Sequence, residues 1–243
     1  FRAGSSVGQL RTKLRTLVGL CVSGDRQEAM VEDQRALWEE FFSDGYYAEH
    51  WPSEDVVRFL MRRIKNTGVE GKRFLDVGCG VGRNLWLASD LGLESYGIDI
   101  SASAVAGARD KLSKRSLSAS VETFDGWRIP FSSHQFDFIV CYGVLDHLSM
   151  AHACWLMEEM ARVSRSNAEV FLKLRSSRCL DTVELMTETE HNTYSLSGDV
   201  EAGIIQHFFD FPLPCPLFFE PGIVGNLSGA FSVVVIQVDF DAR

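Results

Sequence analysis

The spacing of hydrophobic residues changes near residue 73 and divides the chain into two parts. Before this point, residues 30–42 and 53–64 place apolar side chains at helical spacing. Ser53 stands where a helix cap is expected, and two acidic residues follow it in the first turn. The first part therefore predicts two amphipathic helices.

From Arg73 onward, short apolar runs of strand length alternate with helical stretches. Strands are predicted at 73–77, 95–99, 119–124, 136–142, 168–174 and 231–240, and helices at 82–91, 101–114 and 151–164, with Ser101 as the cap of the second helix. This βα alternation predicts an α/β fold, in which a mostly parallel sheet has helices on both faces and the last strand can pair antiparallel.

Two segments fall outside this alternation. Residues 1–29 are predicted to be an N-terminal extension or linker. Residues 176–216 are mixed and polar, then rich in Phe and Pro, and predict a cap insertion after the fifth strand. We therefore expect one domain over residues 30–243, with the first helices serving as a lid.

Charge and composition limit the kinds of binding partner that we expect. The 243 residues carry a net charge of −9, so we expect no nucleic-acid partner. No apolar run reaches the length of a membrane span, so we expect no membrane partner and a cytoplasmic location. The first 24 residues contain four basic residues and no acid, which indicates a solvated segment or the remnant of an organellar targeting peptide. The six cysteines show no metal-binding spacing, so we expect no metal site.

Three glycines fall within five residues directly after the first predicted strand. Gly78, Gly80 and Gly82 follow Asp76, and Asp99 ends the second predicted strand. Glycine permits positive φ and close backbone approach, and the next helix offers free N–H groups to a ligand. Because ligands of open α/β sheets bind at the carboxyl ends of the strands, this turn predicts a site for a nucleotide-like ligand.

The two acidic residues separate the candidate ligands. A dinucleotide site typically has the spacing GxGxxG and holds a pyrophosphate, which Asp76 would repel. The same carboxylate suits an ammonium or sulfonium. Asp99 can accept two hydrogen bonds from a ribose diol, each contributing about 1.5–3 kcal/mol. The pattern therefore favours S-adenosylmethionine over a nicotinamide cofactor.

The segments EDVVRF and EAGIIQHFFDF resemble small-molecule methyltransferases of one class, and three further segments together resemble that class, the class I S-adenosylmethionine-dependent methyltransferases. These three are LDVGCGVGRN, YGIDIS and TFDGWRIPFSSHQFDFIVCYGVLDHL, within about residues 72–174. The resemblance implies a Rossmann-like, doubly wound sheet of seven strands. It also implies a set of cofactor-binding residues: Asp76, Gly78, Cys79, Gly80, Arg83, Asn84, Asp99, Ile100, Asp125, Gly126, Trp127, Cys141 and Tyr142.

The resemblance assigns parts of the cofactor to particular residues. Asp99 would hold the ribose, Asp125 and Gly126 would meet the adenine, and Cys141 and Tyr142 would lie beside the sulfonium. Simpler interpretations remain open. Asp99 could cap the following helix, Asp125 could be a turn residue, and the cysteines could be packing residues.

Methyl transfer to a hydroxyl or an ammonium requires a base, and histidine is suited to this near neutral pH. His147 follows the fourth strand and is the first candidate, with a structural role as the alternative. His207 in the predicted cap is the second candidate, and Asp146 could orient either ring.

Four residues are candidates for contact with the acceptor. Tyr46, Tyr47 and Trp51 form an aromatic cluster that could wall the acceptor or pack as a plain lid. Arg175, just past the fifth strand, could bind an acidic group or form a surface ion pair.

These observations predict a transferase that uses S-adenosylmethionine, releases S-adenosylhomocysteine and methylates a hydroxyl, or an amine, of a small metabolite. A non-catalytic or protein-modifying member of the same fold is one alternative. A nicotinamide-dependent oxidoreductase is another, although Asp76 and the glycine spacing oppose it.

Overall fold

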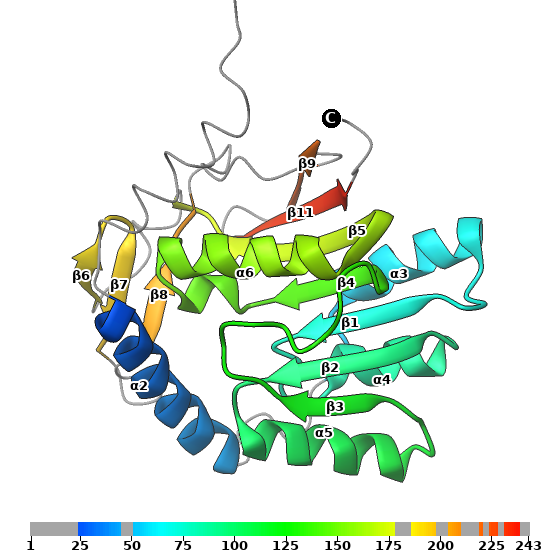
Figure 1. The fold of residues 1–243 in the computed structure, drawn as a ribbon, viewed down its shortest axis with the longest axis horizontal. Coiled ribbons are helices and arrows are strands. Elements are labelled where there is room, and N and C mark those ends of the chain that lie inside the picture. The colour runs from blue at the N-terminus through cyan, green and yellow to red at the C-terminus, as the bar shows by residue number, and fades with distance from the viewer. Residues whose placement is uncertain are drawn as a thin grey trace, which may run out of the picture.

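An eight-stranded sheet with helices on both faces lies at the centre of the protein (Figure 1). The computed structural model describes residues 24–44, 51–177, 186–197, 204–209, 219–220, 224–227 and 231–238. The strand order is β10-β11-β5-β4-β1-β2-β3, and β9 also pairs with β11. The strands are β1 (Arg73–Val77), β2 (Glu94–Asp99), β3 (Ser120–Thr123), β4 (Phe136–Tyr142), β5 (Ser164–Arg175), β9 (Phe219–Glu220), β10 (Val224–Leu227) and β11 (Phe231–Val238).

Strand direction follows the prediction. Strands β1 to β5 are mutually parallel, and β11 pairs antiparallel with β5. The α/β class and the mostly parallel sheet are thus confirmed. The described sheet has eight strands instead of the predicted seven, because the two-residue β9 pairs with the end of β11.

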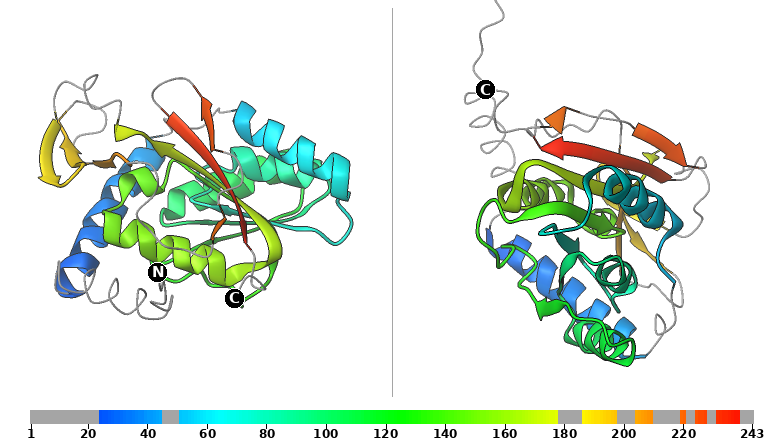
Figure 2. Two further views of the ribbon diagram at one scale, coloured as in Figure 1. Left: turned by 90° about the horizontal axis from the view of Figure 1, so that it is seen from above. Right: turned by 90° about the vertical axis from the view of Figure 1, so that its right-hand side faces the viewer.

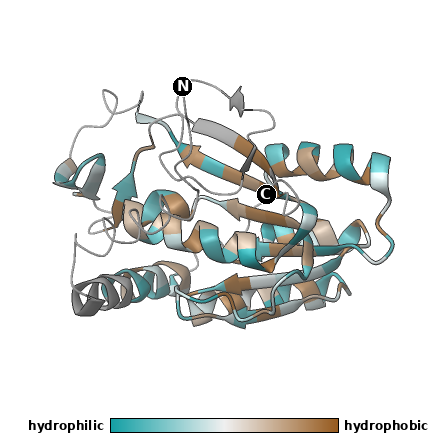
Figure 3. Cartoon of the chain, turned by 45° about the horizontal axis from the view of Figure 1, so that its top comes forward, coloured by the Kyte–Doolittle hydropathy of each residue, from teal (hydrophilic) through white to brown (hydrophobic). Residues whose placement is uncertain are grey.

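Helices cover both faces because side chains alternate across each strand. On β1, Phe74 packs with α3 (Glu54–Thr67), α4 (Arg83–Asp90) and α5 (Ala102–Lys114), whereas Leu75 packs with α6 (Met150–Val163) on the other face (Figure 2). Hydrophobic residues dominate the central strands, while the helices alternate between hydrophilic and hydrophobic positions (Figure 3). Two hydrophobic layers therefore hold the sheet between the helices.

Helix caps agree with the sequence at one of two predicted positions. Ser101 caps α5 as predicted, because its hydroxyl accepts a hydrogen bond from the Ala104 N–H at 3.0 Å. Ser53 stands at the cap position of α3, but its hydroxyl makes no capping bond. Its backbone N–H instead donates to Asn84 Oδ1 at 3.1 Å, which ties the start of α3 to α4. The prediction that Ser53 caps the helix was therefore wrong.

Helix α2 (Gly24–Ser43) lies across the edge of the sheet toward which β1, β2, β3 and β4 point (Figure 1). It begins inside the predicted extension 1–29, because residues 25–29 are mostly good helix formers. None of the described helices is long and apolar enough to cross a membrane.

The described part of the predicted cap forms a second sheet near the same edge. Its three antiparallel strands are β6 (Met186–Glu190), β7 (Thr193–Leu196) and β8 (Ile205–His207). The short helix η1 (Leu145–His147), which follows β4, contacts β8. The carboxyl edge of the main sheet is thus enclosed by α2 and β8.

Candidate active site

The glycine turn after β1 has the backbone conformation that its sequence predicts. Gly78, Gly80 and Gly82 have φ values of 69°, 51° and 78°, which favour glycine. A Cβ atom on Gly78 would lie 2.2 Å from the Val144 side chain, so no larger residue fits there without displacement. The turn therefore brings the backbone after β1 into close contact with the loop after β4.

Two cavities meet at this turn. The first, of about 120 Å³, has a mostly apolar wall that includes Ile100, Phe124 and Trp127. The second, of about 250 Å³, is more polar. Both are lined by Trp38 and Phe42 of α2, by Gly78 and Gly143, and by His147. A ligand that fills both cavities would pass the glycine turn and His147.

The predicted cofactor residues divide between these two cavities. Asp99, Ile100, Gly126 and Trp127 line the first. The second is lined by Cys79, Gly80, Arg83, Asn84 and Tyr142, and Gly78 lines both. Apart from Asp76, Asp125 and Cys141, the structure brings every member of the set to a cavity wall.

Asp99 supports the start of α5 and also lines a cavity. Its Oδ1 accepts from the Ser101 N–H at 3.0 Å, which supports the start of α5, and its Oδ2 accepts from the Gly80 N–H at 2.8 Å. The residue also lines the first cavity. Burial raises the pKa of this carboxyl to about 6, although its backbone hydrogen bonds oppose the shift. Asp99 thus joins the glycine turn, α5 and the cavity wall.

Asp76 is buried directly before the glycine turn, with 1 % of its surface exposed. Burial raises its pKa to about 7, while the charge of Arg83 opposes that shift. Its Oδ2 has no hydrogen-bond partner within the described part of the chain. Since an unsatisfied buried carboxylate is unfavourable, a cationic or hydrogen-bond-donating ligand group would suit this position.

The raised pKa of Asp76 has a measurable effect on stability. A folded-state pKa above the unfolded value near 3.8 means that the folded state binds more protons in between. The contribution of Asp76 to the free energy of unfolding is therefore expected to fall as pH rises from about 4 to about 7. Asp99 and Asp146 act in the same direction and the lowered pKa of His147 acts in the opposite one, so the difference in slope between Asp76→Asn and the unaltered protein isolates the contribution of Asp76. Urea unfolding at several pH values measures it, and identical slopes in both proteins would contradict the assignment.

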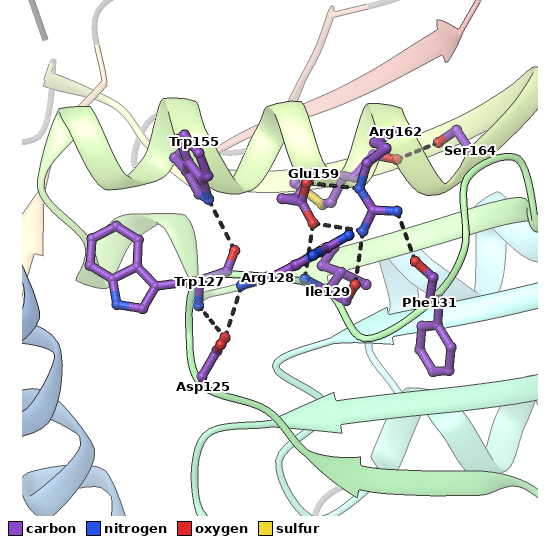
Figure 4. A network of polar contacts seen from close by, with 10 residues as sticks. Asp125, Trp127, Arg128, Ile129, Phe131, Trp155, Glu159, Arg162 and Ser164 are labelled. Atoms are coloured by element: carbon purple, nitrogen blue, oxygen red, sulfur yellow. Dashed lines mark hydrogen bonds and ion pairs between the residues drawn. The ribbon is translucent and has the colours of Figure 1, made fainter. Parts of the chain in front are cut away.

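Asp125 acts as a turn residue in the structure. Its Oδ1 accepts from the N–H groups of Trp127 and Arg128, both at 2.8 Å, and its side chain lines neither cavity (Figure 4). Gly126 and Trp127, which follow it, line the first cavity. Asp125 therefore shapes the loop that reaches the cavity.

One face of α6 fixes this loop from the other side. Trp155 donates to the Trp127 carbonyl at 3.1 Å, and Glu159 accepts from the Ile129 N–H at 3.1 Å (Figure 4). Arg162 donates to the carbonyls of Ile129 and Phe131, each at 2.8 Å. The loop geometry thus depends on residues far from the glycine motif.

His152 belongs to the first cavity, although sequence reasoning gave it no role. Its ring stacks on Trp127 with the centroids 4.2 Å apart, and its Nε2 lies 2.7 Å from the Gly126 carbonyl oxygen. Burial lowers its pKa, so the ring favours the neutral form that stacks in an apolar wall. A histidine one turn into the next helix carries no distinctive sequence signal.

His147, the first candidate base, lines both cavities. Its Nδ1 is 2.9 Å from the Ile205 carbonyl oxygen. Because a carbonyl only accepts, Nδ1 carries the proton and Nε2 is the unprotonated nitrogen. Burial lowers the pKa of the ring to about 4, so His147 is neutral at physiological pH. The Trp38 ring packs edge-on against it, with centroids 4.9 Å apart.

The second histidine candidate lies elsewhere. His207 is buried in β8, where its Nδ1 is 2.7 Å from Thr193 Oγ1 and its ring packs against Phe209. It lines neither cavity. Cys141 is likewise a fully buried core residue on β4, and burial raises the pKa of its thiol. These positions favour structural roles for both residues.

Of the four residues predicted to contact the acceptor, two lie within the described part of the chain, and one of these two lines a cavity. Tyr46 and Tyr47 lie outside the described residues. Trp51 is 79 % exposed, packs on Trp86 and lines neither cavity. Arg175 does line the second cavity. Aromatic side chains of α2, Trp38 and Phe42, line both cavities instead. The sequence showed that α2 has an apolar face, but it did not indicate where the helix packs.

Polar contacts of three residues hold α2 over the cavities. Glu39 accepts from the Ser101 hydroxyl at 2.7 Å and from the Ser103 N–H at 3.2 Å, at the N-terminus of α5. These hydrogen bonds lower the pKa of Glu39, which keeps its charge at this favourable helix end. Arg35 donates to the Asp125 carbonyl at 2.9 Å, and Gln34 accepts from the Ile205 N–H at 3.2 Å. Helix α2 is thus bonded to three different segments around the site.

Candidate metal ligands are not grouped in the part of the chain that the structure describes. No set of three or more His, Cys, Asp or Glu side chains lies there in an arrangement that could hold a metal ion.

Comparison with known proteins gives a consistent result. Residues 74–167 match the family described as a methyltransferase domain. The methyltransferase GfsG of Streptomyces halstedii is 29 % identical over 58 % of this chain and 53 % of its own length. The chloroplastic tocopherol O-methyltransferase of Arabidopsis thaliana is 27 % identical over 56 % of this chain and 45 % of its own. The matches thus span about half the length of these relatives.

A solved structure shares the fold. A protein from Methanosarcina mazei described as a SAM-dependent methyltransferase has a TM-score of 0.61 at 23 % identity, covering 74 % of this chain and 98 % of that one. Residues 74–167 thus match a methyltransferase domain, and the chain is similar in sequence to methyltransferases and in fold to a SAM-dependent methyltransferase.

Proposed function

We propose that this chain transfers a methyl group from S-adenosylmethionine to a hydroxyl, or an amine, of a small molecule. The observation that carries the proposal is the place of His147, which lines both cavities beside the glycine turn and whose Nε2 is the unprotonated nitrogen. The Arabidopsis relative is named as an O-methyltransferase, which supports oxygen as the first choice of acceptor atom.

The residues present fit the cofactor. The apolar first cavity, with its Trp127 and His152 stack, suits an adenine ring, and Asp99 at its wall suits the ribose hydroxyls. The unsatisfied Oδ2 of Asp76 suits the amino group of the methionine part. When bound, the cofactor supplies an electrophilic methyl group attached to a sulfonium.

The chain itself would align the two reactants and supply a proton acceptor. Trp38 and Phe42 border the space between the two cavities and limit water there. Holding two reactants in line contributes about 7–11 kcal/mol in well-oriented model reactions. Nε2 of His147 would take the proton from the acceptor atom, and the Nδ1 bond to Ile205 keeps that nitrogen unprotonated. Arg83, Asn84 and Tyr142 form the polar side of the second cavity.

Calorimetric titration with S-adenosylmethionine, S-adenosylhomocysteine and NADH tests the proposal. We expect the first two to bind at micromolar affinity and NADH not to bind. Binding of NADH alone, or of none of the three, would contradict the cofactor assignment. Binding of the first two without methylation of any compound in an acceptor screen would favour the non-catalytic alternative.

A further inference from the structure

Asp146 is a buried carboxyl in the wall of the second cavity, and the proposed methyl transfer gives it no role. It lies in η1, directly after β4, and 2 % of its surface is exposed. Within the described part of the chain, its side chain makes one hydrogen bond, in which Oδ1 accepts from the Arg175 N–H at 2.7 Å. Both oxygens of a carboxylate accept hydrogen bonds, so this bond leaves Oδ2 for another donor.

The two candidate histidines do not use this carboxyl through Nδ1, although the sequence suggested that it could orient either ring. Nδ1 of His147 lies 2.9 Å from the Ile205 carbonyl oxygen. Nδ1 of His207 lies 2.7 Å from Thr193 Oγ1. In these contacts Asp146 orients neither ring, and its place in the cavity wall points instead to a ligand.

The ionised form of Asp146 needs a further hydrogen-bond donor. Burial raises the pKa of this carboxyl to about 7, whereas the Arg175 N–H and the charges of Arg175 and Lys173 favour the ionised form. A buried carboxylate oxygen that lacks a donor is unfavourable. A ligand group that donates to Oδ2 would therefore form a charge-assisted hydrogen bond, which is stronger than one between neutral groups.

The position of Asp146 in the chain assigns this ligand group to the acceptor. Asp146 directly precedes His147, and both residues line the second cavity. The proposed function uses Asp76 for the amino group of the cofactor and Asp99 for its ribose. The carboxyl of Asp146 thus stands beside the proposed base and apart from the carboxyls assigned to the cofactor.

We propose that Asp146 binds a second hydrogen-bond donor of the acceptor, a hydroxyl or an amino group other than the one that is methylated. This inference rests on the proposed function and names its substrate class. One donor group of such an acceptor gives its proton to Nε2 of His147, and the other keeps its proton and donates it to Oδ2 of Asp146. An analogue without the second group leaves Oδ2 without a donor, and sites built to bind such a group discriminate strongly against analogues that lack it.

The test uses the full chain saturated with S-adenosylhomocysteine and titrated with dihydroxybenzenes, aminophenols and fluorophenols. All positional isomers of each probe are used, so that different spacings of the two groups are covered. The second group is a hydroxyl, an amine or a non-donating fluorine, so the first two probes also distinguish the hydroxyl from the amine. For at least one isomer, a donor probe is expected to bind about tenfold or more tightly than the corresponding fluorophenol.

Asp146→Asn separates ligand binding from the support of β5. Its side-chain carbonyl can still accept from the Arg175 N–H, while its NH₂ group takes the place of Oδ2 and cannot accept from the probe. The variant should fold like the unaltered protein, as judged by its melting temperature, and lose the preference for the donor probe. Asp110→Asn changes an exposed carboxylate on α5, outside both cavities, and should keep that preference.

Failure of the unaltered protein to bind S-adenosylhomocysteine would refute the proposed function. If that ligand binds, the inference is refuted by equal affinity for the donor probes and the fluorophenols, by no binding of any donor probe, or by a preference that survives in Asp146→Asn. Should this variant not fold, the comparison of probes on the unaltered protein decides.

Discussion

Replacing His147 by alanine is expected to lower kcat by about 10²–10⁴, the usual contribution of a positioned general base. The change removes Nε2 from the meeting point of the two cavities, where we place the acceptor proton. Cofactor affinity should change much less, because the ribose and amino contacts come from other residues. Steady-state kinetics with the identified acceptor, together with titration of S-adenosylhomocysteine, separates the two effects.

The pH profile adds a second readout for His147. Because burial holds its pKa near 4, the ring is unprotonated at every pH above about 6, and the rate of the unaltered enzyme should not rise through the usual histidine range. The alanine variant should instead gain rate as hydroxide increases. His191→Ala, at an exposed position between β6 and β7, is the matched control and should keep full activity. Full activity of His147→Ala across the pH range would exclude His147 as the base.

Asp99→Ala is expected to weaken the binding of S-adenosylmethionine and of S-adenosylhomocysteine at least tenfold. Two charge-assisted hydrogen bonds to a ribose contribute about 1.5–3 kcal/mol each, and about 1.4 kcal/mol is already a factor of ten. The variant also removes the acceptor of the Gly80 N–H, so the glycine turn loses a support. Calorimetric titration measures the loss for each ligand.

Structural damage must be separated from lost ribose contacts. Asp99→Asn keeps the side-chain size and one acceptor for the backbone, so it should fold like the unaltered protein and still bind the cofactor weakly. Asp110→Ala removes an exposed carboxylate from the same helix region and should leave affinity unchanged. Melting temperatures of all three variants report on folding. Unchanged affinity in Asp99→Ala would show that the ribose lies elsewhere.

The central sheet and its turn could be predicted because their signals are local. Strands β1 and β4 have the predicted bounds, since each is an apolar run that ends in turn residues. The positive φ angles of the glycine turn and the Ser101 cap are equally local properties of the chain. The location of Asp99 beside the glycine turn could be predicted for a similar reason. The carboxyl end of a strand next to that turn has a fixed place in this topology.

The parts that the sequence did not reveal depend on tertiary contacts. The stripe of α2 showed that one face is buried, but only docking through Glu39 places Trp38 at the cavities. His152 reaches the first cavity because the loop before β4 folds back onto α6, and no short motif encodes that return. His207 was the second candidate base, yet in β8 its ring is buried beside Thr193 and lines neither cavity.

The position of α2 implies an energetic coupling between the two ligands. Trp38 and Phe42 touch both cavities from one helix, so a ligand that orders this helix in the first cavity also orders a wall of the second. Thermodynamic linkage then requires two factors to be equal. The factor by which bound cofactor raises the affinity for the acceptor equals the factor by which bound acceptor raises the affinity for the cofactor. Helix α2 would thereby make each ligand raise the affinity for the other, in addition to any direct contact between them.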